Sequence, residues 1–488
     1  MEDLKQRTIR GGFARLIAQG ASLVLRLGSL MILARLLDPK DFGLVGMVTA
    51  FTGVLTLFRD FGLSAAAVQR TTVSEDQSST LFWINILVGI VLGVAAVSAA
   101  PAIGAFYHEP RLVRVTVALS LGFVFNSMGV QHSALLQRQM RFTAIAVINV
   151  IALLIGSLLA VAGALAGYGY WALVAMTVSM PLVSTICFWV VTRWVPGVPR
   201  QLAGIRSMMH FGGTLTLNGL VAYAAYNSEK VLIGRFWGVD AIGIYGRAYQ
   251  LINIPTENLN SAVGEVAFSA LSRVKDDPPR LKRYFLKGYS LVLGLTLPLT
   301  LACALFAHDL ISVLLGPKWK AAIPIFRLLA PTIGIFAIIN PLGWLLNSLG
   351  LVVRSLRIAL VFAPIMILGY ILGIPHGPKG VALCYSAVMM LWVIPHIAWC
   401  VHGTGITVRD ILAAVSRPLG SAIAAGGIAL GLSMLYGNYL PPLPRLIAEI
   451  TILLAIYSAI VLCATGQRSL YLDLIRGWKT PSTVTVNS

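Results

Sequence analysis

The chain has 488 residues, of which 57% are hydrophobic and only 11% are charged. Soluble domains carry about 25% charged residues, so this composition excludes an ordinary soluble fold. A formal net charge of +19 would suggest a nucleic-acid partner in a soluble protein. Here the basic residues occupy short loops between apolar runs, where they orient a membrane protein in the bilayer.

The N-terminal residues MEDLKQRTIRGG are polar and lead into a long apolar run. That run is too long for a signal-peptide core, and no small-residue cleavage site follows it. We therefore expect an uncleaved first transmembrane helix.

Apolar runs and their polar punctuation divide the rest of the chain. A helix needs about 20 apolar residues to span a ~30 Å hydrocarbon core, so the apolar content suffices for about fourteen spans. We predict an all-α polytopic membrane protein with helices at 11–36, 42–64, 79–101, 112–135, 142–165, 169–192, 209–232, 241–269, 285–307, 322–347, 352–373, 379–401, 411–436 and 446–465.

The distribution of lysine and arginine predicts the orientation. If the N-terminus is cytoplasmic, about 24 of these residues fall in loops on that side and about 11 on the other, with Arg26 and Arg247 inside spans. Excess positive charge marks the cytoplasmic side, so we expect both termini in the cytoplasm. The most basic loop, 273–287, lies on this face and suits anionic lipid.

The cysteines give no sign of a metal or disulfide framework. All five fall inside apolar runs, without a C-x-x-C pair or a His and Cys cluster at zinc spacing. We expect no metal and no cofactor.

The chain is similar to itself at a spacing near 200 residues. ILARLLDPKDFGLVG (32–46) aligns with LIGRFWGVDAIGIYG (232–246), and FYHE (106–109) with FAHD (306–309). The identical pairs in the longer motif are Arg35 with Arg235, Gly43 with Gly243 and Gly46 with Gly246. Because the matches follow the same helix order, the pattern indicates a duplicated unit of six helices.

Six is an even number, so both units enter the membrane from the cytoplasm and form parallel repeats. We predict an N-lobe at 1–200, a C-lobe at 201–403, two extra helices within 404–466 and a cytoplasmic tail at 467–488. Two such lobes facing each other form a central cavity, which favours transport by alternating access.

Polar residues at membrane depth mark the predicted cavity. Arg15, Gln19, Ser22, Arg26 and Ser29 recur at intervals of 4, 3, 4 and 3, which places them on one face of the first helix. An arginine at mid-helix costs at least ~2.5 kcal/mol on insertion scales, so Arg26 should face protein or water.

Two further helices carry similar stripes: Thr49, Thr52, Thr56 and Arg59 on the second, and Gln250, Asn253, Glu257 and Ser261 on the eighth, where Arg247 lies near the outer end. The fourth helix adds Asn126, Gln131, His132 and Arg138, which are compatible with a cavity lining. Such residues also join helices to one another, and arginines near helix ends can snorkel, so a purely structural role stays open.

Arginine holds phosphate bidentately and stays charged, so a cavity lined with arginines suits a pyrophosphate or an acidic sugar. The predicted substrate-binding residues are Arg15, Gln19, Arg26, Arg59, Arg247 and Asn253. Glu257 would either couple transport to H⁺ or Na⁺ or form a fixed salt bridge with an arginine.

Several segments resemble bacterial polysaccharide flippases of the Wzx and colanic acid exporter type, in the multidrug/oligosaccharidyl-lipid/polysaccharide exporter superfamily. They are ARLLDPKDFGL (34–44), FRDFGLSAAAVQR (58–70), LLQRQMRF (135–142), NSEKVLIGRFWGVDAIGIYGRAYQL (227–251) and GPKWKAA (316–322). The resemblance extends from the first helix to about residue 360.

The resemblance implies two six-helix lobes in a V shape that move an undecaprenyl-pyrophosphate-linked repeat unit from the cytoplasmic to the periplasmic leaflet. It also implies cavity arginines on the first, second and eighth helices, which carry Arg15, Arg26, Arg59 and Arg247 here. The two extra helices would form a groove for the polyprenyl tail. We expect a monomer that associates with polysaccharide assembly proteins.

Two other functions stay open at this point. A multidrug or cation antiporter of the same superfamily would share the fold but favour carboxylates and aromatic rings in its cavity. A membrane polysaccharide polymerase or glycosyltransferase would need a sizeable outer loop with catalytic residues, whereas the outer loops predicted here are short. We therefore expect a transporter and not an enzyme.

Overall fold

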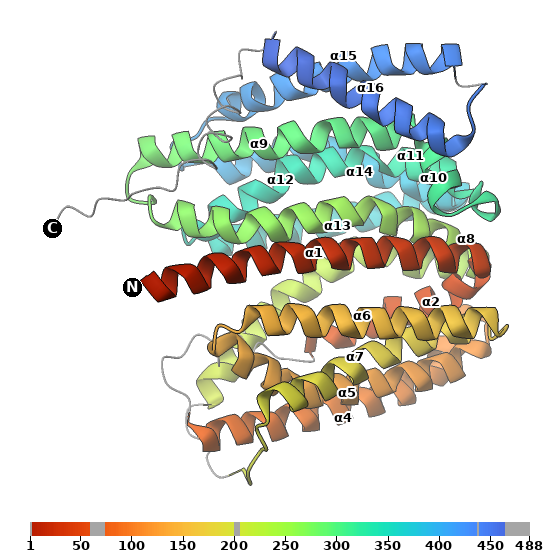
Figure 1. The fold of residues 1–488 in the computed structure, drawn as a ribbon, viewed down its shortest axis with the longest axis vertical. Helices are drawn as coiled ribbons and strands as arrows, with labels where there is room; N and C mark the ends of the chain where they lie inside the picture. Colours follow the sequence, from red (N-terminus) through yellow and green to blue (C-terminus); the bar gives the residue numbers. More distant parts are fainter. Residues whose placement is uncertain (1, 59–73, 200–204, 437–438, 464–488) are drawn as a thin grey trace. The chain divides into compact units, whose positions relative to one another are not determined.

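The computed structural model describes residues 2–58, 74–199, 205–436 and 439–463, and these residues form helices and short connections without a strand (Figure 1). The helices are α1 Glu2–Leu36, α2 Pro39–Phe58, α4 Glu75–Tyr107, α5 Arg111–Arg138, α6 Phe142–Leu165, α7 Tyr170–Thr192, α8 Ile205–Ser272, α9 Pro278–Leu305, α10 Ala307–Leu314, α11 Ala322–Leu329, α12 Pro331–Ser348, α13 Val352–Gly373, α14 Gly377–Val401, α15 Val408–Tyr436 and α16 Pro442–Cys463. Each of the fourteen predicted stretches falls on one or more of these helices, and the predicted stretch 322–347 is divided at Ala330 into α11 and α12.

Eleven stretches of the described residues are long and apolar enough to cross a membrane, and one of them, Val352–Val401, contains both α13 and α14. The protein is therefore a multi-pass membrane protein, as its composition predicts.

Local chemistry explains where several helices begin and break. Ser74 accepts a hydrogen bond from the backbone of Gln77, whose side chain bonds back to the backbone of Ser74, so α4 begins with a complete capping box. The predicted helices 209–232 and 241–269 run together as α8, which is broken at Gly238 by a backbone with φ of 78°. A glycine adopts this left-handed conformation without the steric cost of a Cβ.

The chain forms two compact units. The first comprises residues 1–246 with 314–319, and the second comprises 247–313 with 320–488. In the first unit α4 packs against α5, α6 against α7, and α7 against α5, while α1 lies on α6 and α2 on α5 and α7 (Figure 1).

The second unit repeats this arrangement. The helix pairs α4 with α5, α6 with α7, α5 with α7 and α5 with α6 recur as α9 with α12, α13 with α14, α12 with α14 and α12 with α13. The packing therefore agrees with the duplication inferred from the sequence. The second unit also contains α15 and α16, which pack on α9 and on each other. Lobe boundaries at 200 and 403 stay predictions.

The two copies of the duplicated motif meet inside the first unit. A Cβ atom added to Gly43 would lie 1.9 Å from the carbonyl oxygen of Val239, and one added to Gly243 would lie 1.9 Å from that of Pro39. Gly43 thus packs on Val239 and Gly243 packs on Pro39, and these two partners occupy equivalent positions in the two copies of the motif. These positions accept no side chain, which explains why glycine occupies both.

The segment that precedes α11 closes this junction. Trp319 is fully buried, and its indole Nε1 donates a hydrogen bond to the carbonyl of Ala34 at 2.8 Å. Its ring meets Phe42 edge to face at a centroid distance of 5.4 Å. Lys318 forms an ion pair with Asp38 at 2.9 Å. We call this region, made of 34–43, 239–243 and 318–319, the motif junction.

Candidate functional site

A pocket of about 650 Å³ lies in the first unit among α1, α2, α5, α6 and α7. Its lining residues are Ser22, Arg26, Thr49, Thr52, Gly53, Thr56, Leu119, Gly122, Phe123, Asn126, Asn149, Ala152, Leu153, Met176, Thr177, Met180, Pro181 and Ser184. No aspartate or glutamate occurs among these described residues. The volume is within the ~300–1,000 Å³ range of small-molecule sites.

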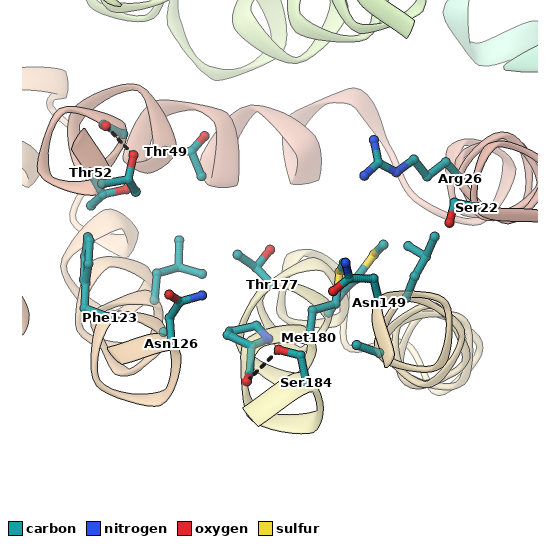
Figure 2. Close-up of a pocket in the computed structure, with 18 residues that line it drawn as sticks. Ser22, Arg26, Thr49, Thr52, Phe123, Asn126, Asn149, Thr177, Met180 and Ser184 are labelled. Atoms are coloured by element: carbon teal, nitrogen blue, oxygen red, sulfur yellow. Dashed lines mark hydrogen bonds between the residues drawn. The ribbon is translucent and has the colours of Figure 1, made fainter. Parts of the chain in front are cut away.

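Arg26 supplies the charge of the pocket. Its side chain is exposed and extends from α1 into the space between the helices, as Figure 2 shows. In the described part of the chain no side chain forms an ion pair or hydrogen bond with its guanidinium. An unpaired arginine in a membrane span needs water or a ligand, so the pocket can bind an anion.

The opposite wall carries neutral polar groups. Asn126 comes from α5, Thr177 from α7 and Asn149 from α6, and in Figure 2 they lie along the side of the pocket facing α2 and Arg26. Phe123 lies beside Asn126 and Met180 near Asn149, and both provide apolar surface. The pocket therefore combines one cation, several hydrogen-bonding groups and apolar patches.

The structure brings some of the predicted residues together and places others elsewhere. Arg26 lines the pocket with Ser22, Thr49, Thr52 and Thr56, so the stripes on α1 and α2 do share one cavity. Gln19 is half-buried and does not line it. The side chain of Arg15 and the whole of Arg59 lie outside the described residues.

The residues predicted on the eighth helix belong to the second unit. Arg247 donates a hydrogen bond to the side chain of Gln250, one turn further along α8. Asn253 is half-buried and Glu257 is exposed. None of these side chains lines the pocket of the first unit, and their roles stay predictions.

The fourth predicted helix, α5, contributes less to a lining than expected. Asn126 faces the pocket, whereas Gln131 and His132 are buried away from it. The His132 ring stacks on Trp189 at 4.5 Å and contacts Phe82 and Trp194, and its Nε2 lies 3.3 Å from the carbonyl oxygen of Trp194. Of the two roles that the sequence left open, Gln131 and His132 therefore have the structural one, and aromatic packing holds the histidine in the core.

Several pocket residues escaped the sequence reasoning. Asn149, Thr177 and Ser184 belong to no polar stripe that recurs at helical spacing, so the sequence did not single them out. Other polar residues of α6 and α7, such as Ser157 and Thr185, do not line the pocket, so polarity alone would not have found them. Glu229 on α8 was also missed: it is fully buried, and neither carboxyl oxygen has a hydrogen-bond partner among the described residues.

Acidic residues near helix ends are paired. Glu109 binds Arg111 through two contacts of 2.7 Å, which keeps the pKa of the Glu109 carboxyl below its usual range. Asp309 binds Arg445 through both carboxyl oxygens and also contacts His308 at 3.1 Å. These pairs, one in each unit, join neighbouring structural elements and stand apart from the pocket.

Comparison with known proteins identifies the family of the chain. The family described as "Polysaccharide biosynthesis protein" matches residues 32–324, more than half of the sequence. The chain belongs to this family. It is 29% identical over 399 residues to the lipopolysaccharide biosynthesis protein WzxC of Escherichia coli strain K12, and the match covers 80% of each chain. It is 32% identical over 299 residues to the teichuronic acid biosynthesis protein TuaB of Bacillus subtilis strain 168, covering 60% of this chain and 61% of that one.

Solved structures confirm the fold of this polysaccharide biosynthesis protein. The lipid II flippase MurJ in an inward closed conformation superposes with a TM-score of 0.72 over 95% of this chain and 99% of its own, at 15% identity. An inward-facing multidrug transporter of the MATE family gives 0.64 over 83% and 99%, at 14% identity. Both are polytopic helical transporters of the architecture predicted from the sequence.

Proposed function

We propose that this protein is a flippase for lipid-linked oligosaccharides, moving undecaprenyl-pyrophosphate-linked polysaccharide repeat units from the cytoplasmic to the periplasmic leaflet by alternating access. The names of its relatives support this substrate class, because WzxC and TuaB serve polysaccharide biosynthesis. The protein relocates its substrate without catalysing a covalent change and acts as a monomer beside polysaccharide assembly proteins.

The observation that carries the proposal is Arg26, which among the described residues has no side-chain partner and no carboxylate beside it in the pocket lining. A cationic drug would be repelled by this arginine and would find no counter-charge in the described lining, which disfavours the multidrug alternative. A pyrophosphate would gain a charge-assisted, forked contact. Gln19 and, outside the described residues, Arg15 and Arg59 would extend this binding surface, and Arg247 and Asn253 are proposed substrate contacts of the second unit.

Substitution of Arg26 tests the proposal. Lysine keeps the charge but loses the forked geometry, so Arg26→Lys should reduce export of lipid-linked units partly and Arg26→Ala severely. Lipid-linked precursor should then accumulate in the cytoplasmic leaflet of cells that express the variants at the normal level. The matched control is Arg327→Ala, which removes an exposed arginine from α11 in the second unit. Normal surface polysaccharide with the Arg26→Ala protein would contradict the proposal.

Ion coupling is assigned to a carboxyl group at membrane depth. An ionised carboxylate without a partner is costly there, and binding H⁺ or Na⁺ removes that cost. Glu257 is the predicted residue, and the buried Glu229 is a second candidate. Glu257→Gln and Glu229→Gln should be compared in proteoliposomes with imposed H⁺ or Na⁺ gradients. Loss of the gradient dependence in one variant alone identifies the coupling residue, and retention in both would remove each from this role.

The proposed location is the bacterial inner membrane with both termini in the cytoplasm. In a variant without the five native cysteines, a cysteine at Pro110 should react with an impermeant thiol reagent in spheroplasts, and one at Arg283 should not. Arg283 suits the test better than its neighbour Lys282, because Lys282 forms an ion pair with Asp410 at 2.6 Å. The reverse labelling pattern would invert the orientation.

A further inference from the structure

Five of the six hydroxyl groups that line the pocket have already donated their hydrogens. Thr52 and Thr177 bond to the carbonyls four residues earlier in their own helices, at 3.0 and 2.9 Å. Thr49, Thr56 and Ser184 bond to the carbonyls three residues earlier. A hydroxyl has one hydrogen and two lone pairs, so these five oxygens can only accept further hydrogen bonds.

Two asparagines provide the complementary donors. Asn126 on α5 is half-buried, and Asn149 on α6 is exposed within the pocket. Neither side chain makes a hydrogen bond in the part of the chain that the structure describes. Each amide offers two donor hydrogens and an acceptor oxygen, so these asparagines, Arg26 and the Ser22 hydroxyl are the described lining residues with donors uncommitted.

This pattern matches a polyhydroxylated ligand. A sugar hydroxyl donates one hydrogen bond and accepts others, so it can donate to a threonine oxygen and accept from an amide at the same time. The apolar side chains of Phe123 and Met180 lie beside Asn126 and Asn149 and can cover the C–H faces of a ring (Figure 2). A hydrocarbon chain would leave the amides without partners, which costs about 1–3 kcal/mol for each group desolvated.

We propose that Asn126 and Asn149, with the acceptor hydroxyls of Thr52 and Thr177, form a sugar subsite that is distinct from the anion contact at Arg26. The inference rests on the proposed function and assigns two binding roles within the pocket. Arg26 binds the anionic group whichever sugar is attached, and the asparagines discriminate among sugars. A site that hydrogen-bonds a hydroxyl discriminates strongly against a ligand without it, because its own polar groups are then left unpaired.

Binding of two lipids to the purified protein in nanodiscs tests this division. The probes are undecaprenyl pyrophosphate alone and the same lipid carrying a disaccharide. Asn126→Leu and Asn149→Leu should each weaken binding of the disaccharide-lipid about fivefold to tenfold and leave binding of the sugar-free lipid unchanged. Arg26→Gln should weaken binding of both lipids by similar factors. Asn347→Leu, at an exposed position on α12 in the second unit, is the matched control and should change neither.

A second pair of variants guards against misfolding. Asn126→Ser and Asn149→Ser keep an acceptor but lose the free donors, because serine in a helix bonds to its own backbone. They should show an intermediate loss for the disaccharide-lipid at an unchanged unfolding temperature. Equal losses for both lipids, or no loss for either, would overturn the sugar subsite while leaving the flippase proposal intact. Failure of the wild-type protein to bind either lipid would instead overturn the proposed function.

Discussion

The motif junction and the pocket lie in the same unit and both contain polar side chains, yet they use them in opposite ways. In the junction, Trp319 and Lys318 are engaged with Ala34 and Asp38, and two glycines allow backbones to touch. In the pocket, Arg26 and the two asparagines have no partner among the described residues. The contrast indicates that a binding site is marked by uncommitted hydrogen-bonding groups and not by polarity alone.

The largest change in stability is expected when a side chain is added to a glycine of the motif junction, and it tests the comparison most severely. Gly43→Val places a Cβ 1.9 Å from a backbone oxygen that cannot rotate away, so it should destabilise the protein by about 3 kcal/mol or more. Thermal unfolding in detergent measures the loss. Gly46→Ala is the matched control, because its Cβ would lie 3.9 Å from Ile242, and it should be neutral or stabilising. Equal stability of the two variants would show that the backbones do not meet at Gly43.

The sequence predicted the junction only in part. Gly43 and Gly243 align in the two copies of the motif, and this alignment required no structure. The contact between the two copies could be seen only in the structure, because self-similarity identifies equivalent positions and does not say which of them touch. The fourteen helices were predictable because each is a long apolar run with polar punctuation. The eight-residue α10 was not, because so short a segment carries no clear period.

The pocket residues were also predicted only in part from the sequence. Arg26 and the threonines of α2 recur on one helical face, and a period of this kind is visible in one dimension. Asn149 and Thr177 lie on different helices, so only the packing of α6 on α7 and α5 brings them to Asn126. His132 misled because burial among aromatic rings leaves no trace in local spacing.

A smaller effect is expected from removing one hydrogen bond of the junction. Trp319→Phe keeps an aromatic ring against Phe42 but loses the donor to the Ala34 carbonyl, which is then buried without this partner. Such a loss costs about 1–3 kcal/mol and should lower the unfolding temperature. Trp171→Phe, at a partly exposed position on α7, should change stability by no more than about 0.5 kcal/mol. A Trp319→Phe protein as stable as wild type would mean that the motif junction, like the pocket, tolerates a polar group without a hydrogen-bond partner.

The smallest expected effect sharpens the comparison through pH. Lys318 hydrogen-bonds to Asp38 and holds the pKa of that carboxyl below its ordinary value, although about half of each side chain is exposed. An exposed pair contributes only about 0–1 kcal/mol, so Lys318→Gln should lower the unfolding temperature slightly at pH 7.

The sign of the pH dependence follows from the lowered pKa. The contribution of the pair is fully present above the unfolded aspartate value of about 3.9 and is lost as pH falls through the lower pKa of folded Asp38. The unfolding temperatures of wild type and Lys318→Gln should therefore converge in acid, and also in high salt, which screens exposed charges. Lys320→Gln, two residues away and also exposed, should match wild type at every pH. A difference that grows toward low pH, or one shared by Lys320→Gln, would show that the Asp38 pair does not stabilise the junction.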